Sequence, residues 1–416
     1  MNKLTKYPFA QLYDMSSGIS STKEQAGHGD PFISFSTVFN NYFLPDVLPD
    51  LMQTTQEEQE IYSVKKGDVF VTRTSETIDE LAMSCVADKN YPNATFSGFT
   101  KRLRSKTQGI VYHRYLAFYL RNNLFRKTIT NNAFMTLRAS FNEDIFSFLN
   151  LYLPEYSEQV KIGDMLFSME QKALANKQIC SELEAMAKTL YDFWFTQFDF
   201  PNAEGKPYRT SGGAMEWNEQ LKREIPKGWM VGNLYRIADY INGLACQKYR
   251  PKDGEGSLPV IKITEMHGGI TNKTEAVSES IPDKYKIYDG DILFSWSATL
   301  EIMYWFGGAG GLNQHIFKVV PKEGFPKEYV YQQLSAYIIN FVKMAEARKT
   351  TMGHITTDHL DQSRIAIPPT PVLERFSEIV RPIHEMIGKY QQQNRELTKL
   401  RDWLLPMLMN GQAVVE

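Results

Sequence analysis

The sequence has few of the residues that build disulfides, metal sites and many active sites. Its 416 residues include three cysteines and seven histidines. The cysteines, Cys85, Cys180 and Cys246, are far apart and form no C-x-x-C pair, which argues against a zinc site or a disulfide framework and fits a reducing cytoplasm. The first residues, MNKLTKYPFAQLY, lack the apolar run of a secretory signal, so export is not expected.

Long apolar runs are also scarce. Residues 292–312 (ILFSWSATLEIMYWFGGAGGL) are the one stretch that resembles a membrane span, since they carry a single charge, Glu301, over 21 positions. An acid at the centre of a spanning helix costs several kcal/mol, and the serines and glycines interrupt any apolar stripe. Two strands joined by a turn are the better interpretation.

Catalytic motifs are missing as well. There is no Walker loop, no H-E-x-x-H and no G-x-S-x-G. Residues 306–310 (FGGAG) match the F-x-G-x-G loop of adenosylmethionine-dependent methyltransferases, but no N-P-P-Y or D-P-P-Y motif accompanies them. A strand-to-strand turn is therefore favoured over a cofactor loop.

The charge total is close to zero, with 46 basic and 48 acidic residues and a net charge of -2. A local count is more informative: residues 41–88 contain ten acids and three bases, whereas residues 89–142 contain ten bases and no acid. Bases interleaved with amides and hydroxyls suit phosphates and base edges, but a solvated face balanced by the acidic stretch fits equally well. The ten bases are Lys89, Lys101, Arg102, Arg104, Lys106, Arg114, Arg121, Arg126, Lys127 and Arg138.

What the chain does contain is a repeat. At roughly 100 to 200 residues per domain, 416 residues predict two or three folding units. GDVFVTRTS at 67–75 is echoed by GDILFSWSA at 290–298, an offset of 223; the pair at 12–13 matches 234–235, an offset of 222; and from residue 138 the offset is a constant 214. Blocks repeated in one order predict a duplication into two similar units.

Each unit ends in a predicted long helix. Positions from 162 to 194, and again from 376 to 408, step by four and three as a heptad seam, with Asn176 and Asn394 as polar positions that set the register. Packing of each helix on its own domain is the simpler possibility, and antiparallel pairing of the two helices, with the two halves held apart, is the alternative that we favour. The apolar residues expected to pair the helices or meet partners are Leu183, Leu190, Trp194, Leu397, Leu404 and Leu408.

Three segments resemble the specificity subunit of type I restriction-modification systems. They are residues 183–213 (LEAMAKTLYDFWFTQFDFPNAEGKPYRTSGG), 221–229 (LKREIPKGW) and 400–412 (LRDWLLPMLMNGQ); GDVFVTRTSET and LNQHIFKV are similar to recurrent segments of that family's recognition domains. The resemblance implies an α+β fold with two similar target recognition domains in a pseudo-two-fold arrangement, separated by two long antiparallel helices. The boundaries are then 1–154 and 229–370 for the recognition domains, 155–196 and 371–411 for the spacer helices, and 197–228 for the linker.

The resemblance also implies the function and the partners. Each domain would recognise half of a split, asymmetric site in double-stranded DNA, and two methylase subunits, which carry adenosylmethionine, would methylate adenine. Restriction subunits, two where the system includes them, would add ATP- and Mg-dependent translocation and cleavage for host defence. The chain itself would be cytoplasmic, non-catalytic and free of cofactor, metal and membrane.

The DNA-contacting residues cannot be taken from the resemblance, because recognition domains differ with their targets. Candidates therefore come from the ends of the Gly-Asp strands and from the basic segment. They are Arg73, Thr74, Ser75, Lys101, Arg102, Arg104, Ser295, Trp296, Ser297, Arg348 and Lys349. Two other functions remain open: an autonomous adenosylmethionine-dependent methyltransferase and a helical scaffold that does not bind DNA.

Overall fold

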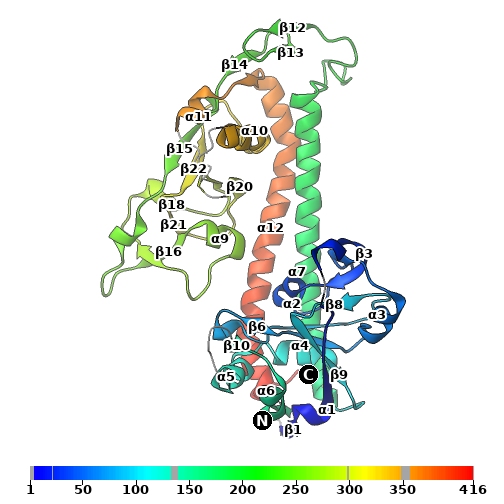
Figure 1. Ribbon diagram of the computed structural model, residues 1–416. Coiled ribbons are helices and arrows are strands. Elements are labelled where there is room, and N and C mark those ends of the chain that lie inside the picture. The colour runs from blue at the N-terminus through cyan, green and yellow to red at the C-terminus, as the bar shows by residue number, and fades with distance from the viewer. Residues whose placement is uncertain (1–3, 21, 133–138, 298, 348–356, 416) are drawn as a thin grey trace. The chain divides into compact units, whose positions relative to one another are not determined.

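The computed structural model describes residues 4–20, 22–132, 139–297, 299–347 and 357–415 (Figure 1). The chain forms two compact units. Unit 1 comprises residues 1–172 and 397–416, and unit 2 comprises residues 173–396. Two separate stretches build unit 1 because the end of the C-terminal helix packs beside the start of the central helix.

Each unit contains a four-stranded antiparallel sheet with the same strand order. In unit 1 the order is β2 (Tyr13–Ser17), β9 (Thr100–Ser105), β5 (Val69–Thr72) and β7 (Ser84–Val86). In unit 2 it is β15 (Ala238–Asn242), β22 (Ile316–Pro321), β19 (Ile292–Ser295) and β20 (Glu301–Tyr304). The side chains of β5 and β19 are buried along their whole length, as expected for central strands.

Smaller sheets repeat as well. A parallel strand pair joins β3 (Ala26–Ile33) to β8 (Thr95–Phe96) in unit 1 and β16 (Ser257–Ile261) to β21 (Gly310–Leu312) in unit 2. Further antiparallel strands flank these pairs, namely β4 (Asp50–Met52), β17 (Ala276–Ser278) and β18 (Lys286–Ile287). Each unit is closed by a two-stranded sheet, β1 (Thr5–Pro8) with β11 (Asn150–Leu153) and β14 (Met230–Gly232) with β23 (Ile365–Ile367).

These equivalent elements confirm the predicted duplication and correct one of its three offsets. The offset of 223 between β5 and β19 holds, and so does the offset of 214 between β11 and β23. The match of 12–13 with 234–235 is wrong. Helices α1 (Phe9–Leu12) and α8 (Leu234–Ile237) each lead directly into the first strand of the sheet, so Leu12 corresponds to Ile237. Both four-residue helices bury their first and last residues. The sequence match pairs the leucine at the end of α1 with the buried leucine at the start of α8, because each happens to be followed by a tyrosine.

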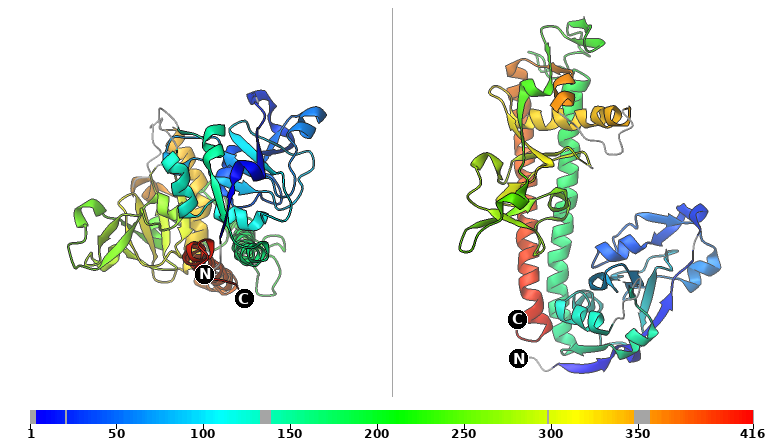
Figure 2. Two further views of the ribbon diagram at one scale, coloured as in Figure 1. Left: turned by 90° about the horizontal axis from the view of Figure 1, so that it is seen from below. Right: turned by 60° about the vertical axis from the view of Figure 1, so that its left-hand side comes forward.

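Two long helices dominate the rest of the chain, α7 (Tyr156–Tyr191) and α12 (Thr370–Met409). Every predicted seam position of both helices is buried or half-buried, as the heptad pattern requires. In unit 1, Arg401 Nη1 donates to Glu170 Oε2 at 3.2 Å. In unit 2, the rings of Trp194 and Phe376 lie 5.6 Å apart. Within each unit the two helical segments therefore lie side by side and antiparallel, which confirms the predicted pairing (Figure 2).

A polar layer interrupts the apolar seam in unit 2. Asn176 is fully buried, and its amide nitrogen donates to Gln393 Oε1 and to Asn394 Oδ1, each at 2.8 Å. Asn394 Nδ2 donates in turn to the carbonyl oxygen of Ala173 at 3.1 Å. A slip of the helices would leave these buried amides without hydrogen bonds, which costs more than the bonds themselves contribute. The layer thus fixes the register, as the sequence predicted.

The predicted pairing residues lie at this seam. Trp194 is 3% exposed, and Leu183 and Leu190 are half-buried against the same core of unit 2. Leu408 is buried and Leu404 half-buried in the core of unit 1, and Leu397 is half-buried.

Shorter helices and strands complete the units. In unit 1 these are α2 (Phe35–Asn40), α3 (Gln56–Ile61), β6 (Thr74–Ser75), α4 (His113–Tyr119), α5 (Asn123–Asn132), β10 (Ala139–Ser140) and α6 (Glu143–Phe148). In unit 2 they are β12 (Met215–Asn218), β13 (Arg223–Pro226), α9 (Ile263–Gly268), α10 (Lys327–Ala347) and α11 (Thr357–Gln362). Single turns of 3-10 helix occur at Lys23–Gln25, Ile78–Glu80, Cys246–Tyr249 and Asp283–Tyr285, and a π-helical turn at Asp192–Thr196.

Much of the stretch predicted as a linker, 197–228, is folded. Strands β12 and β13 form a hairpin, and Phe198 and Phe200 are buried in the core of unit 2, where both rings pack on Trp229. A stretch rich in glycine, proline and charged residues, as this one is, is typical of a linker. The aromatic residues between them anchor it instead.

The apolar stretch 292–312 forms strands and not a spanning helix, as predicted, but it contributes three strands (β19, β20 and β21) where two were expected. Strands β19 and β20 pair antiparallel, and Glu301 Oε2 on β20 lies 3.0 Å from His267 Nε2. FGGAG connects β20 to β21, with the Gly308 amide donating to Asp289 and the Phe306 carbonyl accepting from Arg395. This strand-to-strand turn confirms the prediction and is not the strand-to-helix loop that holds adenosylmethionine. Among the described residues, no helix is both long and apolar enough to cross a membrane.

Candidate nucleic-acid interface

Most bases of the segment 89–142 are bound inside unit 1. Arg104 makes two hydrogen bonds of 2.6 and 2.7 Å to Asp68, which is 2% exposed. Arg114 binds Asp88 in the same bidentate way. Burial raises the pKa of Asp88, but hydrogen bonds from Arg114 and His113 outweigh it and hold that pKa below its ordinary value. The acidic stretch 41–88 thus supplies partners for the basic one.

Two further arginines donate to backbone carbonyls. Arg102 is 9% exposed and donates to the carbonyls of Ile61 and Ser63. Arg121 donates to four carbonyls, and burial lowers the pKa of both guanidinium groups. The four acceptors of Arg121 are Val38, Phe39, Asn41 and Ser84.

These contacts correct the prediction of a basic DNA-binding loop. Lys101, Arg102 and Arg104 lie on strand β9, and the guanidinium groups of Arg102 and Arg104 are used to hold the Ser63 carbonyl and Asp68 in place. Lys101 and Arg104 are both half-buried, but Lys101 Nζ donates only to a hydroxyl, Ser17 Oγ, at 2.8 Å, and not to a buried carboxylate. Arg348 and Lys349, and the base Arg138, lie outside the described residues.

Replacing Arg102 or Arg104 with Ala should therefore lower stability and leave the salt dependence of DNA binding unchanged. Each substitution leaves buried carbonyl or carboxylate oxygens without their donors, which costs about 1–3 kcal/mol. Thermal denaturation measures the first effect, and binding titrations between low and high salt measure the second. A salt slope reduced by about one unit in the Arg104→Ala variant would return this residue to the phosphate contacts.

The same backbone hydrogen bond marks the exposed end of the central sheet in both units. The Arg73 amide donates to the Phe99 carbonyl at 2.8 Å, and the Trp296 amide donates to the His315 carbonyl at 3.3 Å. Arg73 and Trp296 directly follow β5 and β19, and Phe99 and His315 directly precede β9 and β22. We call this place the strand-end site of each unit.

A glycine allows close backbone packing at each strand-end site. An added Cβ on Gly243 would lie 2.1 Å from the carbonyl oxygen of Asn313, and one on Gly18 would lie 2.3 Å from that of Ser97. Real Cβ atoms do not approach backbone oxygens so closely. Only glycine lets the first strand of the sheet pass so near the turn before β9 or β22.

Four positions present side chains at each strand-end site, and their residues differ between the units. In unit 1 they are Ser17, Arg73, Phe99 and Lys101; in unit 2 they are Asn242, Trp296, His315 and Phe317. Pairing of Ser17 with Lys101 and of Asn242 with Phe317 in the two sheets establishes the equivalence. The two units thus share the backbone of the site but differ in all four side chains.

In unit 1 the site is cationic and aromatic. Arg73 is exposed, and the Phe99 side chain is 66% exposed. Burial lowers the pKa of Lys101, and the positive charge of Arg73 lowers it further. The Phe99 amide donates to Ser97 Oγ at 3.2 Å, so the turn that carries the ring is fixed by its own hydrogen bonds.

In unit 2 the site is aromatic and uncharged apart from its histidine. The ring of Trp296 lies 5.6 Å from that of His315, and Trp296 Nε1 donates to Asn242 Oδ1 at 3.1 Å. His315 and Asn242 are exposed, and Phe317 is buried beneath them.

The remaining predicted contacts have structural positions. Ser295 and Ser297 are buried, and Ser295 Oγ donates to the Ser297 carbonyl. Ser75 is 9% exposed and accepts a hydrogen bond from the Thr77 amide, whereas Thr74 is half-exposed. The sequence interpretation missed Phe99, His315 and Asn242, although LNQHIFKV contained His315.

A groove of about 450 Å³ adjoins the strand-end site of unit 1. Its walls combine three phenylalanines with small polar residues and two acids, and the rings of Phe35 and Phe39 are stacked 5.8 Å apart. The residues are Phe35, Phe39, Thr74, Ser75, Glu76, Glu80 and Phe99. The groove thus combines aromatic rings with hydroxyl and carboxylate groups, and no basic residue is among those that line it.

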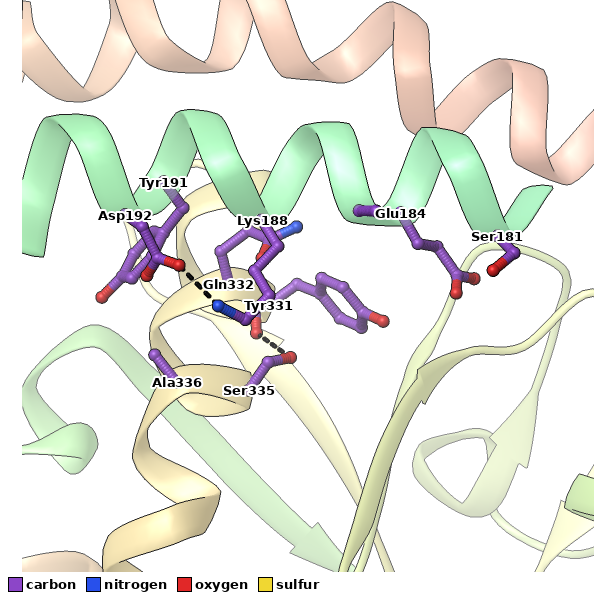
Figure 3. Close-up of a pocket in the computed structure, with 10 residues that line it drawn as sticks. Ser181, Glu184, Lys188, Tyr191, Asp192, Tyr331, Gln332, Ser335 and Ala336 are labelled. Atoms are coloured by element: carbon purple, nitrogen blue, oxygen red, sulfur yellow. Dashed lines mark hydrogen bonds and ion pairs between the residues drawn. The ribbon is translucent and has the colours of Figure 1, made fainter. Parts of the chain in front are cut away.

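A second cavity, of about 300 Å³, lies in unit 2 between α7 and α10. Figure 3 shows Glu184 and Lys188 of α7, and Asp192 of the π-helical turn that follows it, across from Tyr331 and Ser335 of α10. Lys188 is paired with Asp192, and Ser335 Oγ donates to the Tyr331 carbonyl. No histidine or cysteine is among the residues that line this cavity.

Metal and thiol chemistry find no support elsewhere in the part of the chain that the structure describes. No group of three or more His, Cys, Asp or Glu side chains is placed to hold a metal ion within those residues. The three cysteines are free and buried, and burial raises the pKa of the Cys85 thiol to about 12, far from a reactive thiolate.

Comparison with known proteins identifies this architecture. Residues 12–185 and 226–399 each match the family described as the type I restriction modification DNA specificity domain. The two matches cover most of the chain and coincide with the structural repeat. The chain therefore belongs to this family and carries two copies of its domain, which confirms the predicted class, a DNA specificity subunit with two recognition domains.

Individual relatives agree. The chain is 23% identical over 439 residues to the HindI specificity subunit of Haemophilus influenzae, covering 92% of this chain and 94% of that one. It is 27% identical over 275 residues to the MjaIX specificity subunit of Methanocaldococcus jannaschii, covering 63% of this chain and 60% of that one. The solved S subunit of the type I system of M. genitalium shares the fold, with a TM-score of 0.57, 15% identity and coverage of 98% and 96%.

Proposed function

We propose that this chain is the sequence-specific DNA-recognition subunit of a type I restriction-modification complex. Each unit recognises one half of a bipartite, asymmetric site in double-stranded DNA, using its strand-end site. The observation that carries the proposal is the repeated backbone with replaced side chains: the same glycine and the same amide-to-carbonyl bond hold Arg73 and Phe99 in one unit and Trp296 and His315 in the other. Such a scaffold suits two different half-sites.

The chemistry is assigned to partner subunits in the same proposal. Two methylase subunits, which carry adenosylmethionine, methylate adenine in the recognised site. Where restriction subunits are present, two of them use ATP and Mg to translocate and cleave unmodified DNA. The chain itself is non-catalytic, binds no cofactor and works in the cytoplasm. The family match supports this division of labour.

Gel-shift assays with and without the methylase subunits test the proposal. The chain alone should bind DNA weakly and with little preference for sequence, because so many of its bases are bound internally. Addition of methylase should produce a tight complex with the target duplex and not with a scrambled one. Tight and specific binding by the chain alone would contradict the proposal that specific binding requires the methylase subunits.

Two rival functions predict other outcomes. An autonomous methyltransferase would bind adenosylmethionine in calorimetry of the purified chain, and a scaffold would assemble with its partners without binding DNA at any salt concentration. The first is disfavoured by the FGGAG turn, whose groups are bound to Asp289 and Arg395 of the same unit.

A further inference from the structure

The ring of Phe99 is exposed to solvent at the strand-end site of unit 1. Its ring is 66% exposed, although a phenylalanine in this position adds nothing to the core. The turn that carries it is held on three sides: by the Arg73 amide on its carbonyl, by Ser97 Oγ on its amide, and by Gly18 behind the turn. Because the turn is already rigid, an exposed ring on it loses little conformational entropy on binding and is preorganised to contact a partner.

The surroundings of the ring favour base edges over phosphates. Glu80 lines the groove beside it and adds negative charge, which disfavours a phosphate backbone there. The phenylalanine rings that line this groove of the protein suit a methyl group. In the major groove of DNA only thymine presents one. Arg73, joined to Phe99 through the backbone, has the planar donor group that matches the O6 and N7 acceptors of guanine.

We propose that unit 1 recognises its half-site in the major groove through Arg73, which hydrogen bonds to guanine, and Phe99, which contacts the methyl group of a nearby thymine. The inference deepens the proposed function and rests on it. Unit 2 has Trp296 and His315 at the equivalent positions and hence recognises different bases with the same backbone.

Base analogues in the target duplex test each contact separately. The target is first established by sequencing methylated adenines, and binding is then measured by fluorescence anisotropy with the complete complex of this chain and its methylase subunits. Each thymine is replaced in turn by deoxyuridine, which removes only the methyl group. Each guanine is replaced in turn by 7-deazaguanine, which removes only the N7 acceptor.

The expected result is a pair of matched losses. One deoxyuridine should weaken binding of the unaltered complex about fourfold, the equivalent of one buried methyl group, and should have no further effect on Phe99→Ala. One 7-deazaguanine should weaken binding about fivefold, the equivalent of one hydrogen bond, and should have no further effect on Arg73→Ala. Coupling of this kind assigns a residue to a base.

Two more variants exclude a merely structural effect. Arg73→Lys keeps the charge but not the planar donor pair, so it should lose the guanine preference and keep the salt slope. The half-site whose preference changes in this variant belongs to unit 1. Phe148→Ala removes a phenylalanine of similar exposure, 71%, from the end of α6 and should leave all the analogue effects intact.

Several results would overturn the inference. A thymine penalty that persists in full in Phe99→Ala, a guanine penalty that persists in Arg73→Ala, or a unit 1 half-site made only of A·T pairs or only of G·C pairs would each do so. If the unaltered complex showed no preference for any DNA sequence, the proposed function itself would be refuted, so the two failures are distinguishable.

Discussion

Replacing Gly243 with Ala should reduce methylation of the target by roughly 100-fold when the altered chain is assembled with its methylase subunits. The new Cβ would lie 2.1 Å from the Asn313 carbonyl oxygen and 2.5 Å from that of Leu312, and both belong to backbone that cannot rotate away. Overpacking of this kind costs about 1–3 kcal/mol. A shift of about 1 Å in the turn before β22 displaces His315 and Trp296 together, and such misplacement costs on the order of 100-fold.

Gly268→Ala is the matched control. Gly268 belongs to the same unit and has no heavy atom within 4 Å of an added Cβ, so the substitution should leave methylation unchanged. Gly18→Ala should reproduce the effect of Gly243→Ala from unit 1, where the Cβ meets the Phe96 and Ser97 carbonyls at 2.3 Å. Unimpaired methylation by Gly243→Ala would show that the turn is not part of the recognition surface.

Trp194→Ala should lower the free energy of unfolding by about 3–5 kcal/mol. Trp194 is 3% exposed and lies in the π-helical turn that follows α7, with its ring 6.1 Å from that of Phe195 in the same turn and 5.6 Å from that of Phe376 on α12. The indole leaves a cavity that the rigid helices cannot close. Urea denaturation of the isolated chain, followed by circular dichroism at the helical wavelengths, measures the loss.

Trp403→Ala provides the comparison, because Trp403 lies on α12 with 65% of its surface exposed. Its removal should change the stability of the isolated chain by no more than about 0.5 kcal/mol. Equal denaturation midpoints for the two variants would show that the seam does not depend on Trp194.

The helices and the duplication were predictable because both depend on spacing along the chain. A heptad pattern specifies which residues share a helical face, and the two asparagines in it could be recognised as a polar layer before their hydrogen bonds were seen. Blocks repeated in the same order gave the two units. The one wrong offset, at Leu12, came from a four-residue helix that is too short to carry a pattern.

The DNA-binding candidates were less predictable because the sequence shows charges but not their partners. Asp68 and Arg104 are 36 residues apart and meet only because β5 and β9 are neighbours in the sheet. An equal weighting of phosphate contact and internal balance was the most that the charge count allowed. Phe99 gave no signal at all, since exposure of an aromatic ring is decided by a turn and not by composition.

The amide-to-carbonyl bond shared by the two strand-end sites has a consequence for how this protein can change. Because the bond and the glycine behind it involve only backbone atoms, the side chains at positions 73 and 99, or 296 and 315, can be exchanged without rebuilding the fold. Under the recognition proposed above, a new target preference requires only a few point mutations within one unit, and the other unit keeps its own.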